Sequence, residues 1–173
     1  MDIKQLPHDR GDRISYIRII SLVPALMMMV IIFVYSSKPA VVSDGTSTPI
    51  ANAVLSLYEI FFGEIDIMKR HDYLNTANYI VRKTAHVTEY ILLALCISWP
   101  LWIRKLRGKK LILFAFASSL AYAGTDEIHQ LFIEGRSGNL RDVGIDAIGC
   151  AIGTVVFWIL AIQIEKRRKA KKF

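Results

Sequence analysis

The chain has 173 residues, of which 53% are hydrophobic and 21% are charged, and its formal net charge at pH 7 is +7. This length fits a single domain, and the hydrophobic fraction excludes an intrinsically disordered chain. Two cysteines are too few for a disulfide scaffold, and no fixed repeat indicates collagen or a coiled coil. Charges are almost absent from four stretches that are long enough to cross a bilayer, so the composition argues against a soluble globular domain.

The four apolar stretches predict four transmembrane helices. The first covers about residues 19–35, contains no charge and is followed by no cleavage motif, so we interpret it as an uncleaved anchor. The others cover about residues 84–103, 111–132 and 143–164. At 1.5 Å of rise per residue, each approaches or exceeds the roughly 30 Å of hydrocarbon in a bilayer. We therefore predict an all-α, polytopic membrane bundle that forms one domain over residues 1–173.

The long segment between the first two spans carries its own pattern. Residues 43–49 have turn-forming composition, and residues 51–68 are periodic. The apolar stripe of the periodic part consists of Val54, Leu57, Tyr58, Phe61, Ile65 and Met68. Its acidic residues Glu59, Glu64 and Asp66 would be costly inside hydrocarbon. We predict a helix over 51–68 that lies in the outer membrane interface, where it braces the bundle or contacts a substrate.

Lysine and arginine are distributed unevenly about the predicted spans. Fifteen of the 22 basic residues lie before or at the start of the first span, between the second and third, or after the fourth. In a four-span chain these segments are on the same side of the membrane. The positive-inside rule then predicts a multi-pass protein of the cell membrane with both termini in the cytoplasm. The basic residues that follow the fourth span are suited to contact lipid head groups. We expect no nucleic acid as a partner.

Polar side chains interrupt three of the spans near their predicted outer ends. Such groups cost several kcal/mol in hydrocarbon unless they face protein or water. They are Lys83, His86, Glu89 and Tyr90 on the second span, Asp126, Glu127, His129 and Gln130 on the third, Arg136 and Arg141 in the connection that follows, and Asp142 and Asp146 on the fourth. The second span enters from outside, the third ends there and the fourth begins there, so helical spacing and topology predict one polar pocket that opens outward.

The pocket residues allow a structural role and a binding role. Ion pairs such as Lys83 with Asp126, or Arg136 with Asp142, would lock the helices together without any chemistry. In a binding protein, Lys83, Arg136 and Arg141 would contact the phosphate or carboxylate of a ligand.

The same pocket also allows acid–base catalysis on a lipid. His86 or His129 would act as the general base, and Asp126 or Glu127 would orient it, with Glu89 as a further catalytic candidate. No H-E-x-x-H spacing or nucleotide-binding motif is present, so we predict neither a metal nor a cofactor. Transport of a small solute is less favoured, because four spans without an inverted repeat leave little room for alternating access.

Small residues in the spans indicate where helices approach closely. Gly149 and Gly153 have the G-x-x-x-G spacing that lets two helix backbones meet, either within one chain or between two copies. Cys96 and Cys150 lie in mid-span, where we expect them to pack as small apolar residues.

Three motifs together resemble a known family. The second predicted span begins with the run from Lys83 to Tyr90, KTAHVTEY. The third ends with DEIHQ, from Asp126 to Gln130, and Gly135-Arg136 follows it; the fourth contains Asp142, Asp146 and Gly149. Over about residues 36–156 the chain is similar to the VanZ-like family of small bacterial membrane proteins.

This resemblance implies an integral membrane protein of the bacterial cell envelope. The founding member of the family is associated with reduced susceptibility to the glycopeptide teicoplanin. The residues that match the family motifs are Lys83, His86, Glu89, Tyr90, Asp126, Glu127, Gln130, Arg136, Asp142 and Asp146. Together with the predicted pocket, the resemblance makes membrane lipids, and a lipid-linked envelope precursor or a glycopeptide, the expected partners.

Overall fold

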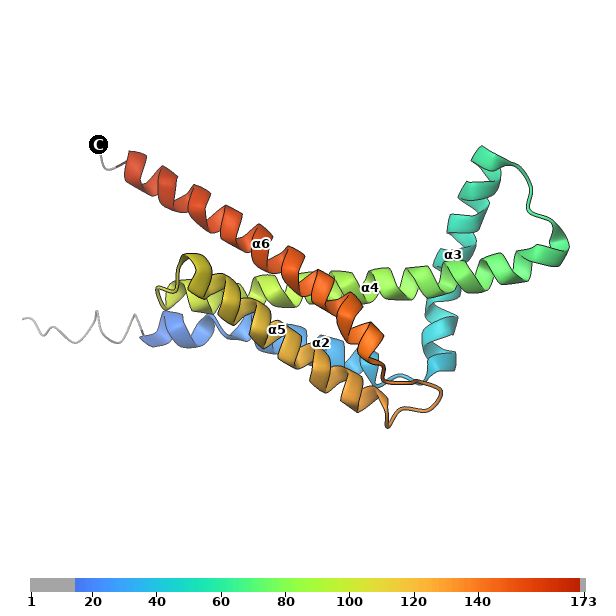
Figure 1. Cartoon of the computed structure of the whole chain (residues 1–173), viewed down its shortest axis with the longest axis horizontal. Coiled ribbons are helices and arrows are strands. Elements are labelled where there is room, and N and C mark those ends of the chain that lie inside the picture. The colour runs from blue at the N-terminus through green and yellow to red at the C-terminus, as the bar shows by residue number, and fades with distance from the viewer. Residues whose placement is uncertain (1–14, 172–173) are drawn as a thin grey trace, which may run out of the picture.

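The computed structural model describes residues 15–171, and all regular elements in this range are helices (Figure 1). They are α2 (Val23–Ser36), α3 (Ala40–Phe62), α4 (Ile67–Ile103), α5 (Gly108–Gln130) and α6 (Leu140–Ala170). Within residues 15–171, four helical segments are long and apolar enough to span a membrane: Ser15–Ser36, which contains α2, and then α4, α5 and α6. The prediction of an all-α membrane bundle is confirmed.

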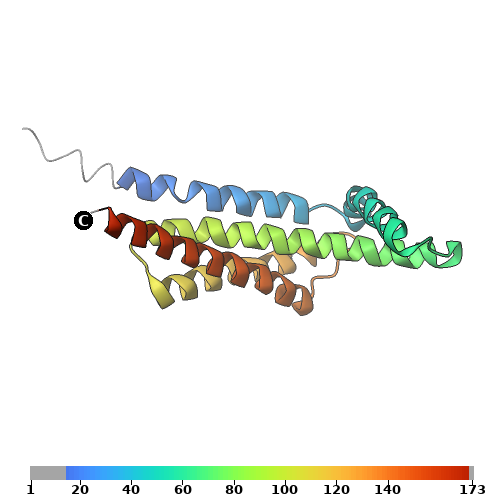
Figure 2. The same ribbon diagram turned by 90° about the horizontal axis from the view of Figure 1, so that it is seen from above.

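Helix α4 is the centre of the bundle, because it contacts every other helix from α2 to α6. Figure 2 shows α2 running along α4, and Figure 1 shows α6 crossing α4 obliquely. A core cluster without exposed surface joins the four spanning helices: Ile32 from α2, Tyr90 and Leu93 from α4, Ala123 from α5 and Cys150 from α6. Cys150 therefore packs as a small core residue, as predicted, whereas Cys96 is only partly buried.

The two glycines of the G-x-x-x-G motif lie where α6 contacts α4. A Cβ atom added to Gly149 would lie 2.5 Å from the carbonyl oxygen of Val87. One added to Gly153 would lie even closer to the carbonyl oxygen of Ile91. Only glycine lets the two backbones approach this closely. The structure thus places the motif in a contact within the chain.

Helix α4 starts well before the predicted span at 84–103. Residues 67–83 form its first half, and Asp66 caps it by accepting a hydrogen bond of 3.0 Å from the backbone N–H of Met68. The 37 residues of α4 span about 55 Å at 1.5 Å each, which exceeds the roughly 30 Å of a hydrocarbon core. The first half of α4 accordingly extends past the ends of α2 and α5 (Figure 1).

The predicted turn at 43–49 was wrong, because these residues lie inside α3. The helix starts at Ala40 and contains Pro49. Its hydroxyl groups bond back to the preceding turn: Thr46 to the carbonyl of Ser43 at 2.8 Å and Thr48 to that of Asp44 at 2.7 Å. Packing of this stretch against α4 overrides its weak local helix propensity.

Helix α3 also ends earlier than the predicted helix at 51–68. It ends at Phe62, and Gly63 follows with a positive φ of 93°, a conformation that favours glycine. The face of α3 that contacts α4 carries Ala51 and Leu55, which are buried against Ala77. Four members of the predicted apolar stripe lie on α3 and are 42–73% exposed: Val54, Leu57, Tyr58 and Phe61. The other two do not continue the stripe, because Ile65 packs against the cluster of Ala51, Leu55 and Ala77 and Met68 belongs to α4.

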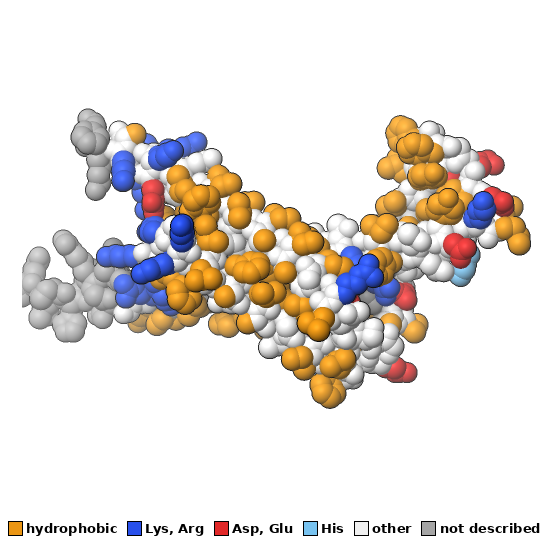
Figure 3. Space-filling model, viewed as in Figure 1, with side chains coloured by type: hydrophobic (Ala, Val, Ile, Leu, Met, Phe, Trp, Pro, Cys, Tyr) orange, Lys and Arg blue, Asp and Glu red, His pale blue; other side chains and the backbone are white. Residues whose placement is uncertain are grey.

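Basic side chains gather at the end of the bundle that carries the C-terminus (Figure 3). We call this the basic end; it is formed by the start of the Ser15–Ser36 segment, the connection between α4 and α5, and the last turns of α6. Lys4, Arg10, Arg13 and Lys172, which contribute to the charge asymmetry of the sequence, lie outside the described residues. The orientation of the basic end in a membrane stays a prediction.

Candidate functional site

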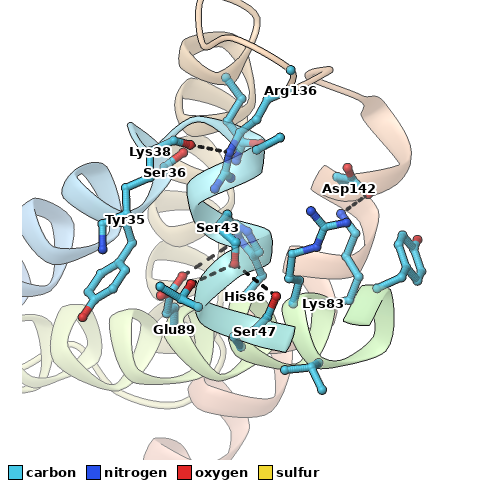
Figure 4. Close-up of a pocket in the computed structure, with 18 of the residues that line it drawn as sticks. Tyr35, Ser36, Lys38, Ser43, Ser47, Lys83, His86, Glu89, Arg136 and Asp142 are labelled. Atoms are coloured by element: carbon cyan, nitrogen blue, oxygen red, sulfur yellow. Dashed lines mark hydrogen bonds and ion pairs between the residues drawn. The ribbon is translucent and has the colours of Figure 1, made fainter. Parts of the chain in front are cut away.

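A cavity of about 420 Å³ lies at the end of the bundle opposite the basic end (Figure 4). It forms where the end of α2, the first half of α3, the middle of α4, the connection between α5 and α6, and the start of α6 meet. Its volume falls in the roughly 300–1,000 Å³ range of small-molecule sites. Six charged side chains line it: the cations Lys38, Arg82, Lys83 and Arg136, and the carboxylates Glu89 and Asp142. The lining therefore carries an excess of positive charge.

Two of the cations form ion pairs between helices. Lys83 of α4 contacts Asp142 of α6, with 2.6 Å between Nζ and Oδ1. Arg82 of α4 contacts Asp44 of α3 at 2.5 Å. The pairs named from the sequence, Lys83 with Asp126 and Arg136 with Asp142, are not formed. Asp142 is the nearer partner of Lys83, because it lies in the first turn of α6 beside the middle of α4.

Arg136 reaches the cavity from the connection between α5 and α6. Gly135 turns this connection with a φ of +72°, and a Cβ there would meet the Cβ of Ala40 at 3.1 Å. Arg136 then donates from Nε to the carbonyl oxygen of Lys38 at 3.0 Å. Figure 4 shows this bond on the side of the cavity formed by the end of α2.

The guanidinium of Arg136 lacks a carboxylate partner. Among the described residues, no carboxylate oxygen lies within 4.0 Å of it. Burial and the neighbouring Arg82 lower the pKa of Arg136 from its ordinary value, because both disfavour the charged form, although the carboxylates of Asp126, Glu127 and Glu89 partly oppose this. An anion in the cavity would offset that cost.

His86 and Glu89 lie one helical turn apart on α4 and both line the cavity. The Nδ1 atom of His86 is 3.9 Å from Oε2 of Glu89, which is longer than a hydrogen bond. This Nδ1 is buried and has no hydrogen-bond partner within residues 15–171. The two side chains are close enough to act as a pair after a small rotation.

A layer of buried polar groups lies outside the cavity lining. Tyr90, Asp126 and Asp146 are at most 4% exposed, and none of them lines the cavity. Gln130, which does line it, donates to Oδ2 of Asp126 at 3.2 Å. One oxygen atom on each of Tyr90, Asp126 and Asp146 has no hydrogen-bond partner in the described part of the chain. These residues thus support the cavity from within the bundle.

Glu127 has a structural contact that its position in the motif did not indicate. Its Oε2 accepts a hydrogen bond of 3.0 Å from the backbone N–H of Asn139, just before α6. The side chain is 5% exposed. It therefore holds the connection between α5 and α6, which carries Arg136, against the end of α5.

Six residues predicted to belong to the pocket do not line the cavity: Tyr90, Asp126, Glu127 and Asp146, described above, and His129 and Arg141. His129 faces α2, where its Nε2 is 3.0 Å from the hydroxyl of Ser37 and its ring stacks on Phe33 with 4.6 Å between centroids. Arg141 is exposed and does not line the cavity. His129 directly precedes Gln130, and Arg141 directly precedes Asp142, and both of these neighbours line the cavity. One position along a helix is a rotation of about 100°, so adjacent side chains point in different directions.

The sequence reasoning missed the contribution of α3. Ser43, Thr46 and Ser47 line the cavity, as does Arg82 beside the predicted Lys83. The hydroxyl of Ser47 donates to the side chain of Asn78 on α4. The one available signal was the concentration of hydroxyl residues at 43–48 within a long connection between two spans.

Comparison with known proteins places the chain in a family. The family model of VanZ/LLP1 matches residues 21–161. No curated protein and no solved structure matches the chain. The matched range contains all four spanning segments in whole or in large part and every residue that lines the cavity. On this evidence, the chain belongs to the VanZ/LLP1 family.

Proposed function

We propose that this protein binds the phosphate-bearing head group of an envelope lipid, or of a lipid-linked envelope precursor, in the cavity opposite its basic end. The observation that carries this proposal is the half-buried guanidinium of Arg136. It lines the cavity, is held by one backbone carbonyl and has no carboxylate within 4.0 Å among the described residues. A guanidinium in this state is a strong, bidentate donor for a phosphate.

The charge balance of the cavity supports an anionic ligand. Asp142 neutralises Lys83 and Asp44 neutralises Arg82, so these pairs contribute mainly to the attachment of α6 and α3 to α4. Lys38 and Arg136 are the lining cations without such a partner in residues 15–171. Lys38 instead lies over the ring of Tyr35, with 4.3 Å between Nζ and the ring centroid. Arg136 is therefore the lining cation that is available to a phosphate in the cavity.

The surroundings of the cavity favour a lipid over a free solute. Helix α3 forms one wall with its polar residues, and its opposite face exposes large apolar side chains. The exposed stripe suits the interface between head groups and acyl chains. A lipid could therefore keep its chains in the membrane while its head group enters the cavity. The positive-inside rule puts this end of the bundle outside the cell.

A second candidate is acid–base catalysis on the same bound lipid. It is favoured by the position of His86 and Glu89, which line the cavity 3.9 Å apart. Contacts of a general base with its partner often tighten only when substrate is bound. Of the other candidates, His129 lies against α2 and Glu127 is bonded to Asn139. Catalysis would accordingly rest on His86 with Glu89.

Comparative lipid mass spectrometry of the purified protein tests the binding proposal. Arg136→Gln is expected to lose about tenfold of any specifically bound anionic lipid, since a charge-assisted, bidentate contact disappears. Arg141→Gln removes the same charge from an exposed position outside the cavity, so it should retain the lipid. Equal lipid content in both variants would contradict the proposal.

Two further measurements distinguish the roles of the bound lipid. If the protein is an enzyme, His86→Asn should retain the lipid but change its chemical form in the spectrum. If binding protects the envelope, expression of wild-type protein should reduce susceptibility to teicoplanin, and Arg136→Gln should abolish that effect while Arg141→Gln preserves it. If susceptibility to teicoplanin is unchanged in a strain that expresses the folded protein, this protein has no role in teicoplanin resistance.

A further inference from the structure

A second hollow lies near the basic end, far from the cavity described above. It is a groove of about 350 Å³ between the first spanning segment, α4 and α5. Its walls are mostly apolar and include Leu22, Leu26 and Met29 from the first segment, and Ile97 and Leu101 from α4. The stretches 22–29 and 97–104 each extend about 10 Å along a helix, so the groove is two helical turns long.

A cation stands at one end of this apolar groove. Arg104 follows the last residue of α4 and lines the groove. Its Nη1 donates to the carbonyl oxygen of Pro100 at 3.1 Å, and its Nη2 donates to that of Arg18 at 3.0 Å. Within the described residues, no carboxylate lies within 4.0 Å of its guanidinium. These two carbonyls hold the charged group beside the groove without neutralising it.

The charges around Arg104 select the kind of ligand. Lys105, Arg107, Lys109 and Lys110 follow directly, and among them only Arg107 has an acidic partner in the described residues, Glu165 at 2.5 Å. Such a cluster at the end of spanning helices attracts anionic lipids of the adjacent leaflet. An apolar groove with a guanidinium at its mouth is complementary to an acyl chain that leads to a phosphate.

The cation at the mouth of the groove favours a lipid over a helix of a second copy as its occupant. The spanning helices expose mainly apolar side chains, which would leave Arg104 without an anionic partner. The phosphate of an anionic lipid supplies that partner while one acyl chain follows the apolar wall.

We propose that the groove between the first spanning segment, α4 and α5 binds an anionic phospholipid of the leaflet at the basic end, with an acyl chain in the groove and the phosphate on Arg104. This site is separate from the cavity proposed to bind an envelope head group. Its occupant would attach the first spanning segment to the rest of the bundle.

Native mass spectrometry of the full chain tests this proposal. The delipidated protein is titrated in detergent with phosphatidylglycerol or with phosphatidylcholine of the same acyl chains. All proteins carry Arg136→Gln, so lipid bound in the other cavity does not contribute. The background protein is expected to bind one phosphatidylglycerol about tenfold more tightly than phosphatidylcholine, and Arg104→Gln should remove this preference.

Two more variants keep the test decisive. Lys109→Gln removes a charge at the same end from a residue outside the groove, so it should retain the preference. Ser118→Phe adds bulk to the groove from an exposed position on α5 and leaves Arg104 in place, so it should weaken binding of both lipids at least fivefold. This variant decides the question if Arg104→Gln does not fold.

Three results would overturn the inference. The first is a phosphatidylglycerol preference that persists in folded Arg104→Gln protein. The second is unchanged binding of both lipids by Ser118→Phe. The third is a lipid-free dimer as the main species, disrupted by Ser118→Phe, which would identify a second copy as the occupant. None of these results would bear on the cavity that Arg136 lines, because every protein in the experiment lacks that arginine.

Discussion

Replacement of Gly149 by valine is expected to separate α6 from α4. A Cβ at this position would lie 2.5 Å from the carbonyl oxygen of Val87, 3.1 Å from the Cβ of Tyr90 and 3.3 Å from the backbone nitrogen of Ile91. Two of these atoms belong to the backbone of α4 and cannot rotate away. Non-bonded carbon atoms prefer a separation of about 3.5–4.0 Å, so α6 would have to move outward by about 1 Å.

The expected cost follows from this displacement. Overpacking at a close contact costs about 1–3 kcal/mol, and three added carbon atoms against a rigid backbone place Gly149→Val near the upper value. In a chain of this length, each kcal/mol corresponds to about 2–4 °C in Tm, so a decrease of about 6–12 °C is expected. Helix propensity hardly contributes, since glycine and valine differ by roughly 0.5 kcal/mol or less.

Thermal unfolding of the purified protein in one detergent measures this effect. Gly144→Val is the matched control, because Gly144 lies on the same helix and nothing is within 4 Å of an added Cβ. Its Tm should stay within about 2 °C of the wild type. Size-exclusion chromatography of both variants records the oligomeric state.

Equal Tm values for Gly149→Val and Gly144→Val would refute the close contact between α4 and α6. A different failure is also informative. If Gly149→Val keeps its Tm but converts an oligomer to a monomer, the glycine motif joins two copies of the chain and the contact within the chain is not the important one.

Further changes test the ion pair and the topology. Lys83→Met should lower the free energy of unfolding by about 1–3 kcal/mol, which is less than for a fully buried pair because the side chains of Lys83 and Asp142 are 23% and 19% exposed. The double exchange Lys83→Asp with Asp142→Lys should restore stability. If it does not, the ion pair between these two residues is contradicted. In whole cells, an impermeant thiol reagent should label a cysteine at Glu64 but reach one at Lys109 only after permeabilisation, and the reverse pattern would invert the topology.

The number and kind of spanning elements could be predicted from composition alone. A chain inside hydrocarbon must satisfy its own backbone polar groups, so an apolar stretch of sufficient length and without charges forms a helix there. This reasoning predicted four spans and an all-α fold. Outside the hydrocarbon it fails: residues 67–83 carry many charges, and their helix is recognisable locally only from the cap at Asp66.

The membership of the cavity was only partly predictable from the sequence. Helical spacing and topology correctly brought Lys83, His86 and Asp142 to one end of the bundle. They could not distinguish Gln130, which lines the cavity, from His129, which packs on α2. Neighbouring positions differ by about 100° around a helix, and the face that turns inward depends on the contacts of that helix with its partners.

Only the tertiary structure decided the walls and pairings of the cavity. Ser43 and Ser47 line it because α3 crosses α4, a contact between segments that are about 30 residues apart in the chain. Lys83 pairs with Asp142 and leaves Arg136 without a carboxylate among the described residues, and this follows from the distance between three helix ends. Periodicity and hydropathy describe each segment by itself, whereas an ion pair depends on the positions of two segments relative to each other.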